Sequence, residues 1–212
     1  METQIYLVRH GQSIGNAKGF YQGHTNMDLS EVGVYQANLT AERLKDVHID
    51  VIYSSDLARA HNTALPHAKL RGLDVINSRL LREMYIGDWE GLPIADLKRD
   101  HYQEFVIDWH EDFGNFRFPN GESVLEAGER VYNEILRIAK ENIGKTVLIV
   151  SHAAVIRAFW CKMCGVAPSD MAKAFPFPTN ASFSTLKYNG SELVPGEFSC
   201  DDHIPVSNIP AL

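Results

Sequence analysis

Short apolar runs alternate with longer amphipathic segments along most of this chain. Apolar runs rich in β-branched residues predict strands at residues 4–8, 51–53, 75–76 and 146–151. Runs of this kind are typical of strands buried on both faces of a parallel sheet. Between and after these runs, the pattern predicts helices at residues 29–45, 56–72, 123–142 and 153–164.

The residues that flank these helices agree with their expected ends. Ser30 suits an N-cap, Ser123 with Glu126 forms a capping-box pattern, and Gly72 suits the position just after a helix. A late hairpin is expected around Asn189-Gly190, between strands at 182–188 and 192–194. The order of elements predicts an α/β fold, a three-layer α/β/α sandwich around a mostly parallel sheet.

Residues 92–122 interrupt the alternation of strands and helices. The segment contains Trp109 and several phenylalanines, and it begins with a charged helical stretch. We expect it to form a cap inserted over the edge of the sheet, within a single domain spanning residues 1–212. We expect residues 201–212 to be a loose tail.

Composition and charge narrow the class of protein. The 212 residues are 45% hydrophobic and 22% charged, which are ordinary globular values. A net charge of −7 with no basic stripe argues against nucleic acid and anionic membranes as partners. The chain starts with a strand, which leaves no room for a secretory signal, and its three cysteines are an odd, sparse set. We therefore expect a cytoplasmic protein, either a monomer or a homodimer.

Two of the predicted strands end in a histidine. Arg9 and His10 follow the first strand, and Ser151 and His152 end the strand at 146–151. Because open α/β sheets bind ligands at the carboxyl ends of their strands, these side chains are expected at one edge. Two histidines and an arginine can hold an anion beside a nucleophile, which indicates phosphate chemistry.

The segment after the first strand carries the chemistry most directly. Arg9 offers a planar fork for phosphate oxygens. The imidazole of His10 is neutral near pH 7, so one nitrogen is free to attack phosphorus. Gly11 and Gly15 permit a tight turn, and Asn16 can donate to a phosphate oxygen.

This string, Arg-His-Gly-x-Ser-x-x-Asn, resembles the signature of the histidine phosphatase superfamily, the phosphoglycerate mutase-like proteins. Further segments resemble the family's other motifs, and in the same order. They are Tyr21-Gln22-Gly23 in a substrate loop, Ser54-Ser55-Asp56-Leu57-Ala58-Arg59, Leu81-Arg82-Glu83 with Gly87-Asp88-Trp89-Glu90-Gly91, and Ser151-His152-Ala153-Ala154, where Gly-Gly is commoner than Ala-Ala.

The resemblance implies a role for each matching residue. His10 would be the nucleophile that becomes phosphohistidine, and Glu83 would protonate the leaving oxygen. Arg9, Arg59 and His152 would hold the phosphoryl group, assisted by Asn16, and the remaining substrate contacts would come from Gln22, Gly23, Ser151 and Ala153. General chemistry agrees, because phosphoryl transfer needs fixed cations and a leaving alkoxide needs a proton. The spacings of the nine histidines match no paired metal-ligand pattern, and no carboxylate cluster accompanies them, so we expect no metal and no cofactor.

Three functions fit these residues: a phosphomonoester phosphatase, a phosphoglycerate mutase-type phosphotransferase, and a noncatalytic phosphate-binding protein. The mutases carry extra basic residues after the acid motif, including an arginine pair. Here the cap has only Lys98, Arg99 and Arg117. We therefore expect a phosphomonoesterase of the histidine acid phosphatase type, acting on small organic phosphates. A plainer interpretation remains for Glu83, which could simply pair with Arg82 or Arg79.

Overall fold

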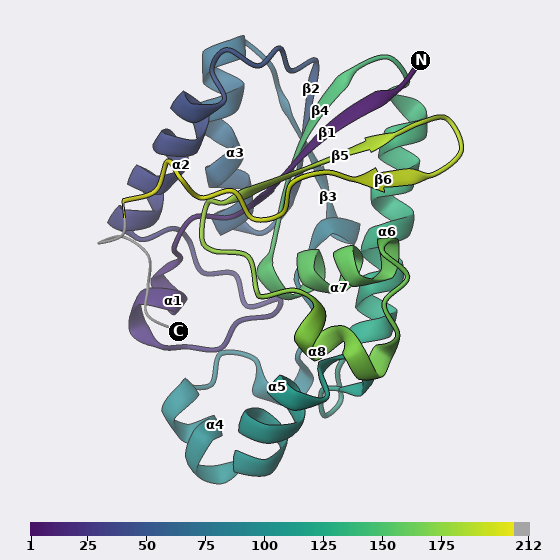
Figure 1. Ribbon diagram of the computed structural model, residues 1–212. Coiled ribbons are helices and arrows are strands. Elements are labelled where there is room, and N and C mark those ends of the chain that lie inside the picture. The colour runs from purple at the N-terminus through teal and green to yellow at the C-terminus, as the bar shows by residue number, and fades with distance from the viewer. Residues whose placement is uncertain (206–212) are drawn as a thin grey trace.

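The computed structural model describes residues 1–205 and builds one mixed sheet from the predicted strands (Figure 1). The six strands, in the spatial order β3-β2-β4-β1-β5-β6, are β1 (Thr3–Arg9), β2 (Val51–Ser55), β3 (Val75–Ser78), β4 (Thr146–Ser151), β5 (Phe183–Tyr188) and β6 (Leu193–Pro195). Strands β1 to β4 are parallel, whereas β5 runs antiparallel to β1 and β6 runs antiparallel to β5. The expectation of a mostly parallel sheet is confirmed.

Helices connect the strands and extend into the cap. They are α1 (Ile14–Lys18), α2 (Glu31–Arg43), α3 (Ala58–Arg71), α4 (Ile94–Asp100), a π-helix (Tyr102–Asp108), α5 (Trp109–Glu111), α6 (Val124–Glu141), α7 (Ala153–Met163) and α8 (Met171–Ala174). The expected caps are present at Ser30, at Gly72 with φ 63°, and as a capping box between Ser123 and Glu126. Helix α1 was not predicted from the sequence. A second capping box, between Ser13 and Asn16, lies at its N-terminus.

Alternate side chains of the buried strands face two separate cores. Ile5 and Leu7 of β1 belong to a cluster that also includes Val131 of α6 and Val155 of α7. Val8, one residue further, belongs to the cluster with alanines of α3. The sheet is therefore covered by α2 and α3 on one face and by α6 and α7 on the other, as Figure 1 shows. This is the expected three-layer sandwich.

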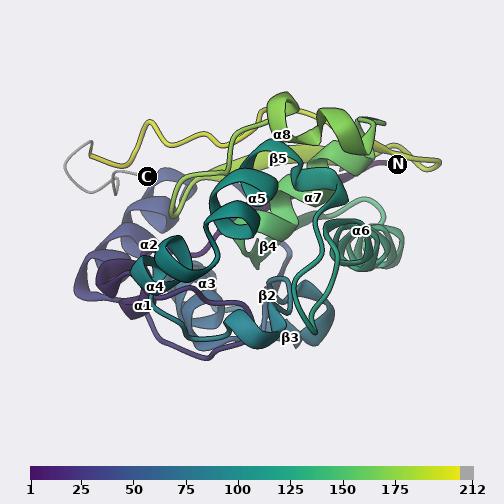
Figure 2. The same cartoon turned by 90° about the horizontal axis from the view of Figure 1, so that it is seen from below.

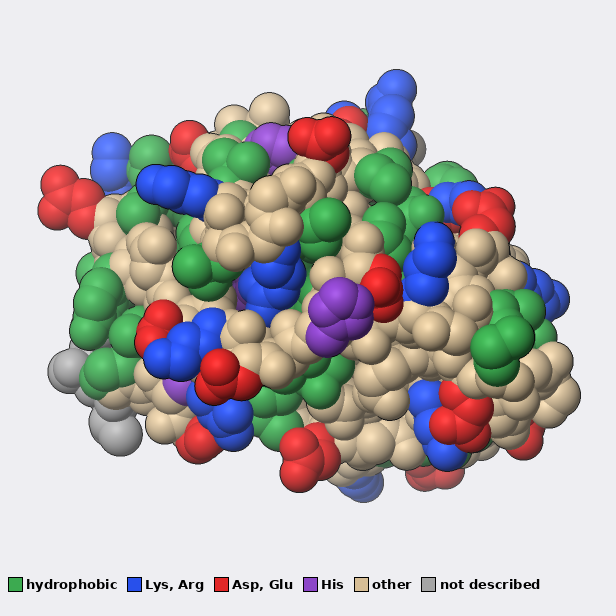
Figure 3. Space-filling model, turned by 90° about the horizontal axis from the view of Figure 1, so that it is seen from above, with side chains coloured by type: hydrophobic (Ala, Val, Ile, Leu, Met, Phe, Trp, Pro, Cys, Tyr) green, Lys and Arg blue, Asp and Glu red, His purple; other side chains and the backbone are tan. Residues whose placement is uncertain are grey.

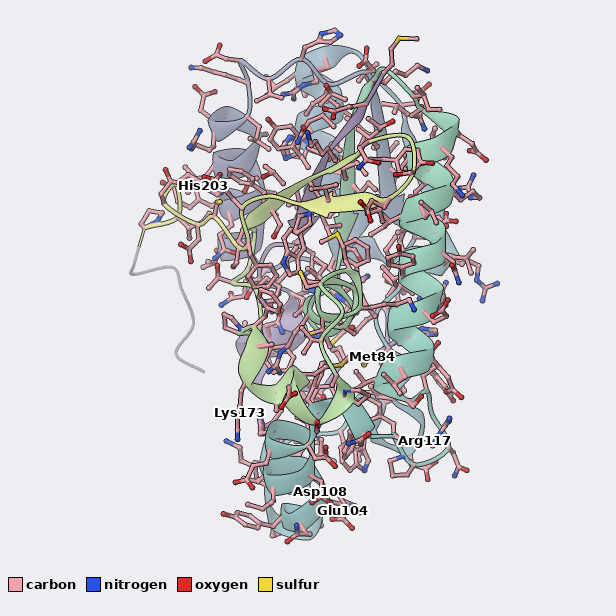
Figure 4. The ribbon with its side chains drawn as sticks, turned by 45° about the vertical axis from the view of Figure 1, so that its right-hand side comes forward. Met84, Glu104, Asp108, Arg117, Lys173 and His203 are labelled. Atoms are coloured by element: carbon pink, nitrogen blue, oxygen red, sulfur yellow. The ribbon has the colours of Figure 1, made fainter. Side chains whose placement is uncertain are left out.

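The cap segment lies beyond the end of the sheet, where α4 and α5 are seen in Figures 1 and 2. Its aromatic side chains pack on one another and on Trp89: Trp109 lies 4.9 Å from Phe113 and 5.0 Å from Phe118, measured between ring centroids. Figure 4 shows Met84, which is fully buried, between the body of the protein and the cap. The cap is thus joined to the main core.

The expectation of a loose tail is wrong for residues 201–205. Asp201 accepts a hydrogen bond from Thr179 Oγ1 at 2.8 Å, and Ile204 is 5% exposed. Long-range packing against the chain before β5 holds this segment, and such packing leaves no periodic signal in twelve residues of sequence. The rest of the expected tail, residues 206–212, lies outside the described residues.

The surface carries mixed charge. On the face shown in Figure 3, Lys and Arg side chains are scattered among Asp and Glu side chains. Within residues 1–205, no helix has the length and apolar character needed to cross a membrane.

Candidate active site

The order of the sheet gathers the candidate residues at one edge. Strands β2, β4 and β1 are neighbours, and the register pairs Arg9 with Ser151. His10 follows β1, His152 follows β4, and Arg59 lies in the first turn of α3, which follows β2. The rings of His10 and His152 are 5.1 Å apart between centroids. The site thus forms where three parallel strands end, as expected for an open α/β sheet.

The imidazole of His10 is held in its neutral form. Its side chain is 4% exposed, and Nδ1 lies 2.7 Å from the carbonyl oxygen of Gly11, to which it donates its proton. The ring carries one proton when neutral, so Nε2 keeps its lone pair. Burial, followed by the charges of Arg59 and Arg9, holds the pKa of His10 well below its ordinary value.

Arg59 is fixed by the loop at residues 21–25. Its two terminal nitrogens donate to the carbonyl oxygens of Gly23 and Thr25, each at 2.8 Å. That loop is held in turn by Glu90, whose carboxylate accepts from the backbone nitrogens of His24 at 2.6 Å and Thr25 at 2.7 Å. A generic arginine in a first helical turn would be solvated, but this one is 1% exposed.

Arg9 is anchored at one end only. Its Nη1 donates to the carbonyl oxygen of Pro178 at 2.5 Å, whereas its Nε is buried and has no partner among residues 1–205. Burial lowers the pKa of both Arg9 and Arg59 to about 10. Both guanidinium groups therefore remain charged at neutral pH, so the buried site is cationic and suited to an anion.

Glu83 is buried against the N-terminus of α7. Its carboxylate accepts from the backbone nitrogens of Ala154 and Val155, each at 3.1 Å, and of Met84 at 3.0 Å. The plainer interpretation of an ion pair with Arg82 is wrong, because Arg82 makes a two-pronged contact with Asp56 at 2.6 Å. The carboxylate therefore lies at the start of α7, directly after His152, and close enough to Arg9 and Arg59 to interact with their charges.

The loop that carries Glu83 is held from two sides. Arg130 of α6 donates to the carbonyl oxygens of Leu80, Arg82 and Glu83 at 2.9 to 3.2 Å. Ser151, expected to contact substrate, instead donates its hydroxyl proton to the carbonyl oxygen of Leu81 at 2.8 Å. Ser151 thus supports the loop from the end of β4.

The remaining expected substrate contacts differ in placement. Gln22 donates to Ser13 Oγ at 2.8 Å, and its buried Oε1 has no hydrogen-bond partner within the described part of the chain. A side chain at Gly23 would meet Glu90 Oε1 at 2.3 Å, so only glycine fits there. Asn16 is exposed, and its Oδ1 is used in the capping box of α1. Ala153 is half-buried at the start of α7.

Sequence reasoning missed the residues that support the site. Glu90 and Ser55 lie inside motifs that resemble the family's, but nothing in the sequence shows which backbone groups they bind. No sequence pattern marked Arg130 as a supporting residue, because one arginine on an amphipathic helix is ordinarily a surface residue. Within residues 1–205, no three His, Cys, Asp or Glu side chains gather in a way that could hold a metal ion.

Comparison with known proteins gives a consistent result. The family model described as "Histidine phosphatase superfamily (branch 1)" matches residues 5–199. The chain is 36% identical to "Phosphoserine phosphatase 1" of Hydrogenobacter thermophilus, over 87% of this chain and 86% of that protein. It is 32% identical to "Probable phosphoglycerate mutase GpmB" of Yersinia pestis, over 89% of this chain and 86% of that one.

Solved structures resemble the whole fold. A mycobacterial glucosyl-3-phosphoglycerate phosphatase superposes with a TM-score of 0.85 at 26% identity, covering 95% of this chain and 100% of that one. A phosphoserine phosphatase from Entamoeba histolytica, in complex with 3-phosphoglyceric acid, superposes with a TM-score of 0.80 at 28% identity, covering 96% and 100%. Proteins named as phosphatases thus share both the sequence pattern and the architecture.

Proposed function

The chain belongs to branch 1 of the histidine phosphatase superfamily, and we propose that it hydrolyses small phosphomonoesters through a phosphohistidine formed on His10. One observation carries the proposal. The unprotonated Nε2 of His10 lies in a buried site with two charged arginines and a second histidine. A nucleophile beside fixed cations is the arrangement that phosphoryl transfer needs.

In the first step, Nε2 of His10 attacks phosphorus as the ester bond to the leaving oxygen breaks. Negative charge spreads over the three equatorial oxygens, and Arg9, Arg59 and His152 are placed to stabilise it. Glu83, in its protonated form, gives its proton to the leaving oxygen, so that an alcohol departs. The products of this step are the alcohol, phosphohistidine and the Glu83 carboxylate.

In the second step, water attacks the phosphoryl group, and the bond to Nε2 of His10 breaks. The Glu83 carboxylate accepts the proton of the attacking water and is ready for the next cycle. Inorganic phosphate leaves, and neutral His10 is restored. The site therefore returns to its starting state with no cofactor in the balance.

A phosphatase fits this cap better than a mutase. Arg99 is engaged by Asp96 and Asp100, and Arg117 is paired with Glu126. Two of the three basic side chains of the cap therefore have carboxylate partners in this chain, and the cap lacks the adjacent arginine pair that the mutases carry. A phosphoglycerate mutase is the second candidate function, because a relative that is 32% identical is named as a probable phosphoglycerate mutase.

The names of the relatives suggest substrates for this chain. Phosphoserine and glucosyl-3-phosphoglycerate are both small esters, so we propose a substrate of that size class. The lowered pKa of His10 keeps the nucleophile unprotonated in mild acid, which supports the acid phosphatase type.

A phosphate-release screen tests the proposal. The panel should contain phosphoserine, glucosyl-3-phosphoglycerate, 3-phosphoglycerate, sugar phosphates, nucleotides and an aryl phosphate, each with and without 2,3-bisphosphoglycerate. We expect release of inorganic phosphate without the bisphosphate. Interconversion of phosphoglycerates that depends on the bisphosphate, with little phosphate release, would instead support the mutase.

A further inference from the structure

Ser55, at the carboxyl end of β2, contacts the second histidine of the site through a buried hydrogen bond. Its Oγ lies 2.8 Å from Nε2 of His152, and both residues are 0% exposed. We propose that Ser55 is a positioning residue that donates this hydrogen bond and fixes His152 in the tautomer with its proton on Nδ1. The inference rests on the proposed function, because it states how His152 offers a donor to the phosphoryl group.

The surroundings of Ser55 decide the direction of the hydrogen bond. A serine hydroxyl has one proton to donate and two lone pairs that accept. The backbone nitrogen of Leu57 donates to Ser55 Oγ at 3.4 Å and uses one lone pair. Among residues 1–205, Nε2 of His152 is the acceptor available to the hydroxyl proton. If His152 donated instead, a fully buried hydroxyl proton would lack an acceptor, which is costly.

The protonation of His152 makes the tautomer matter. Burial, followed by the charges of Arg59 and His10, holds the pKa of His152 well below its ordinary value, so the ring carries one proton. With Nε2 accepting from Ser55, that proton lies on Nδ1. Nδ1 is buried and has no partner among the described residues.

Phosphoryl chemistry needs this tautomer. The oxygens of a phosphoryl group on His10 only accept hydrogen bonds, and the ring of His152 is 5.1 Å from that of His10. Two buried donors therefore have no acceptor among the described residues: Nδ1–H of His152 and Nε–H of Arg9. The other tautomer would present a lone pair to the phosphoryl oxygens, which is repulsive.

The test compares Ser55→Ala with two matched variants. Ser55→Ala should move the proton of His152 partly or wholly to Nε2 and lower kcat/KM about 10-fold to 100-fold, as expected for losing a buried hydrogen bond. Ser55→Thr keeps the hydroxyl and should restore both. Ser54→Ala removes the neighbouring buried hydroxyl, which donates to the carbonyl oxygen of Ser55 at 2.8 Å. That control should leave the tautomer and kcat/KM unchanged.

The tautomer is read from nitrogen-15 spectra of the histidine side chains, without substrate. A wild-type His152 with its proton on Nε2 would overturn the proposal, even if Ser55→Ala fails to fold. A Ser55→Ala protein that keeps the Nδ1 proton and the wild-type kcat/KM would also overturn it. Failure of the proposed function is seen separately, as wild-type protein that shows the Nδ1 proton but releases no phosphate.

Discussion

Glu83→Gln removes the proton that we assign to the leaving oxygen while it keeps the shape of the side chain. The hydrogen bonds of the Glu83 carboxylate show what else the substitution would change. Oε1 of Glu83 accepts from Met84 and Val155, and Oε2 accepts from Ala154. A glutamine oxygen in the Oε1 position keeps two of these three hydrogen bonds. Its amide nitrogen then faces the backbone N–H of Ala154, which loses its acceptor.

The two consequences differ in size. One buried N–H without an acceptor costs about 1–3 kcal/mol of folding stability. Loss of general acid catalysis costs about 10²–10⁴-fold in rate, or about 2.7–5.5 kcal/mol of transition-state stabilisation. The second cost applies in full to an alkyl phosphate, whose leaving alkoxide is strongly basic. It applies much less to an aryl phosphate, whose phenolate leaves without help.

The assay is kcat/KM on a sugar phosphate and on p-nitrophenyl phosphate, with urea unfolding of each protein. We expect a loss approaching the general-acid range on the sugar phosphate and a far smaller loss on the aryl substrate. Glu122→Gln is the matched control, because the Glu122 carboxylate supports the same loop by accepting hydrogen bonds from Arg130 and from the backbone nitrogen of Tyr85. The Glu122→Gln substitution should lower kcat/KM by the same factor for both substrates. Equal losses on both substrates for Glu83→Gln would refute the acid assignment.

Three further predictions follow from the site and the core. His10→Ala should abolish turnover without changing the melting profile. Rapid quenching should trap an acid-labile, base-stable phosphoryl label on the wild type but not on this variant, and a variant that still becomes labelled would contradict the mechanism. Dialysis against a chelator should leave the rate within about twofold, because the arginines supply the positive charge; a loss that magnesium or zinc restores would contradict this. Burial lowers the pKa of His67 from 6.5 to about 3, so between these values only the unfolded state takes up the proton. The stabilisation is complete above pH 6.5, and between pH 6.5 and about 3 each pH unit costs about 1.4 kcal/mol of folding stability. His67→Leu should remove that part of the slope in urea unfolding at pH 7, 6 and 5, and an unchanged slope would count against it.

Local features of this protein were readable from its sequence because their causes are local. The β-branched runs marked the four parallel strands, and Ser30, Gly72 and the Ser123–Glu126 pair marked helix ends within a few residues. Helix α1 was missed, although its capping box lies in the sequence, because five residues are too few to show helical periodicity.

The candidate site was predictable as a set of residues, because histidines at strand ends meet wherever the strands are parallel neighbours. Its supporting contacts were not. Arg59 binds carbonyl groups more than thirty residues away, and Ser55 meets His152 across 97 residues. Glu83 could have paired with the adjacent Arg82, but the Arg82 guanidinium instead donates two hydrogen bonds to Asp56.

The sequence by itself determined the alternation of buried strands and helices, the helix caps and the chemical types at the strand ends. Tertiary structure decided the order of the strands, the antiparallel pairing of β5 and β6, and which donor binds which buried acceptor. The physical reason is that periodicity and capping act over a few residues, whereas hydrogen-bond pairing in the interior depends on which distant groups folding excludes from water together.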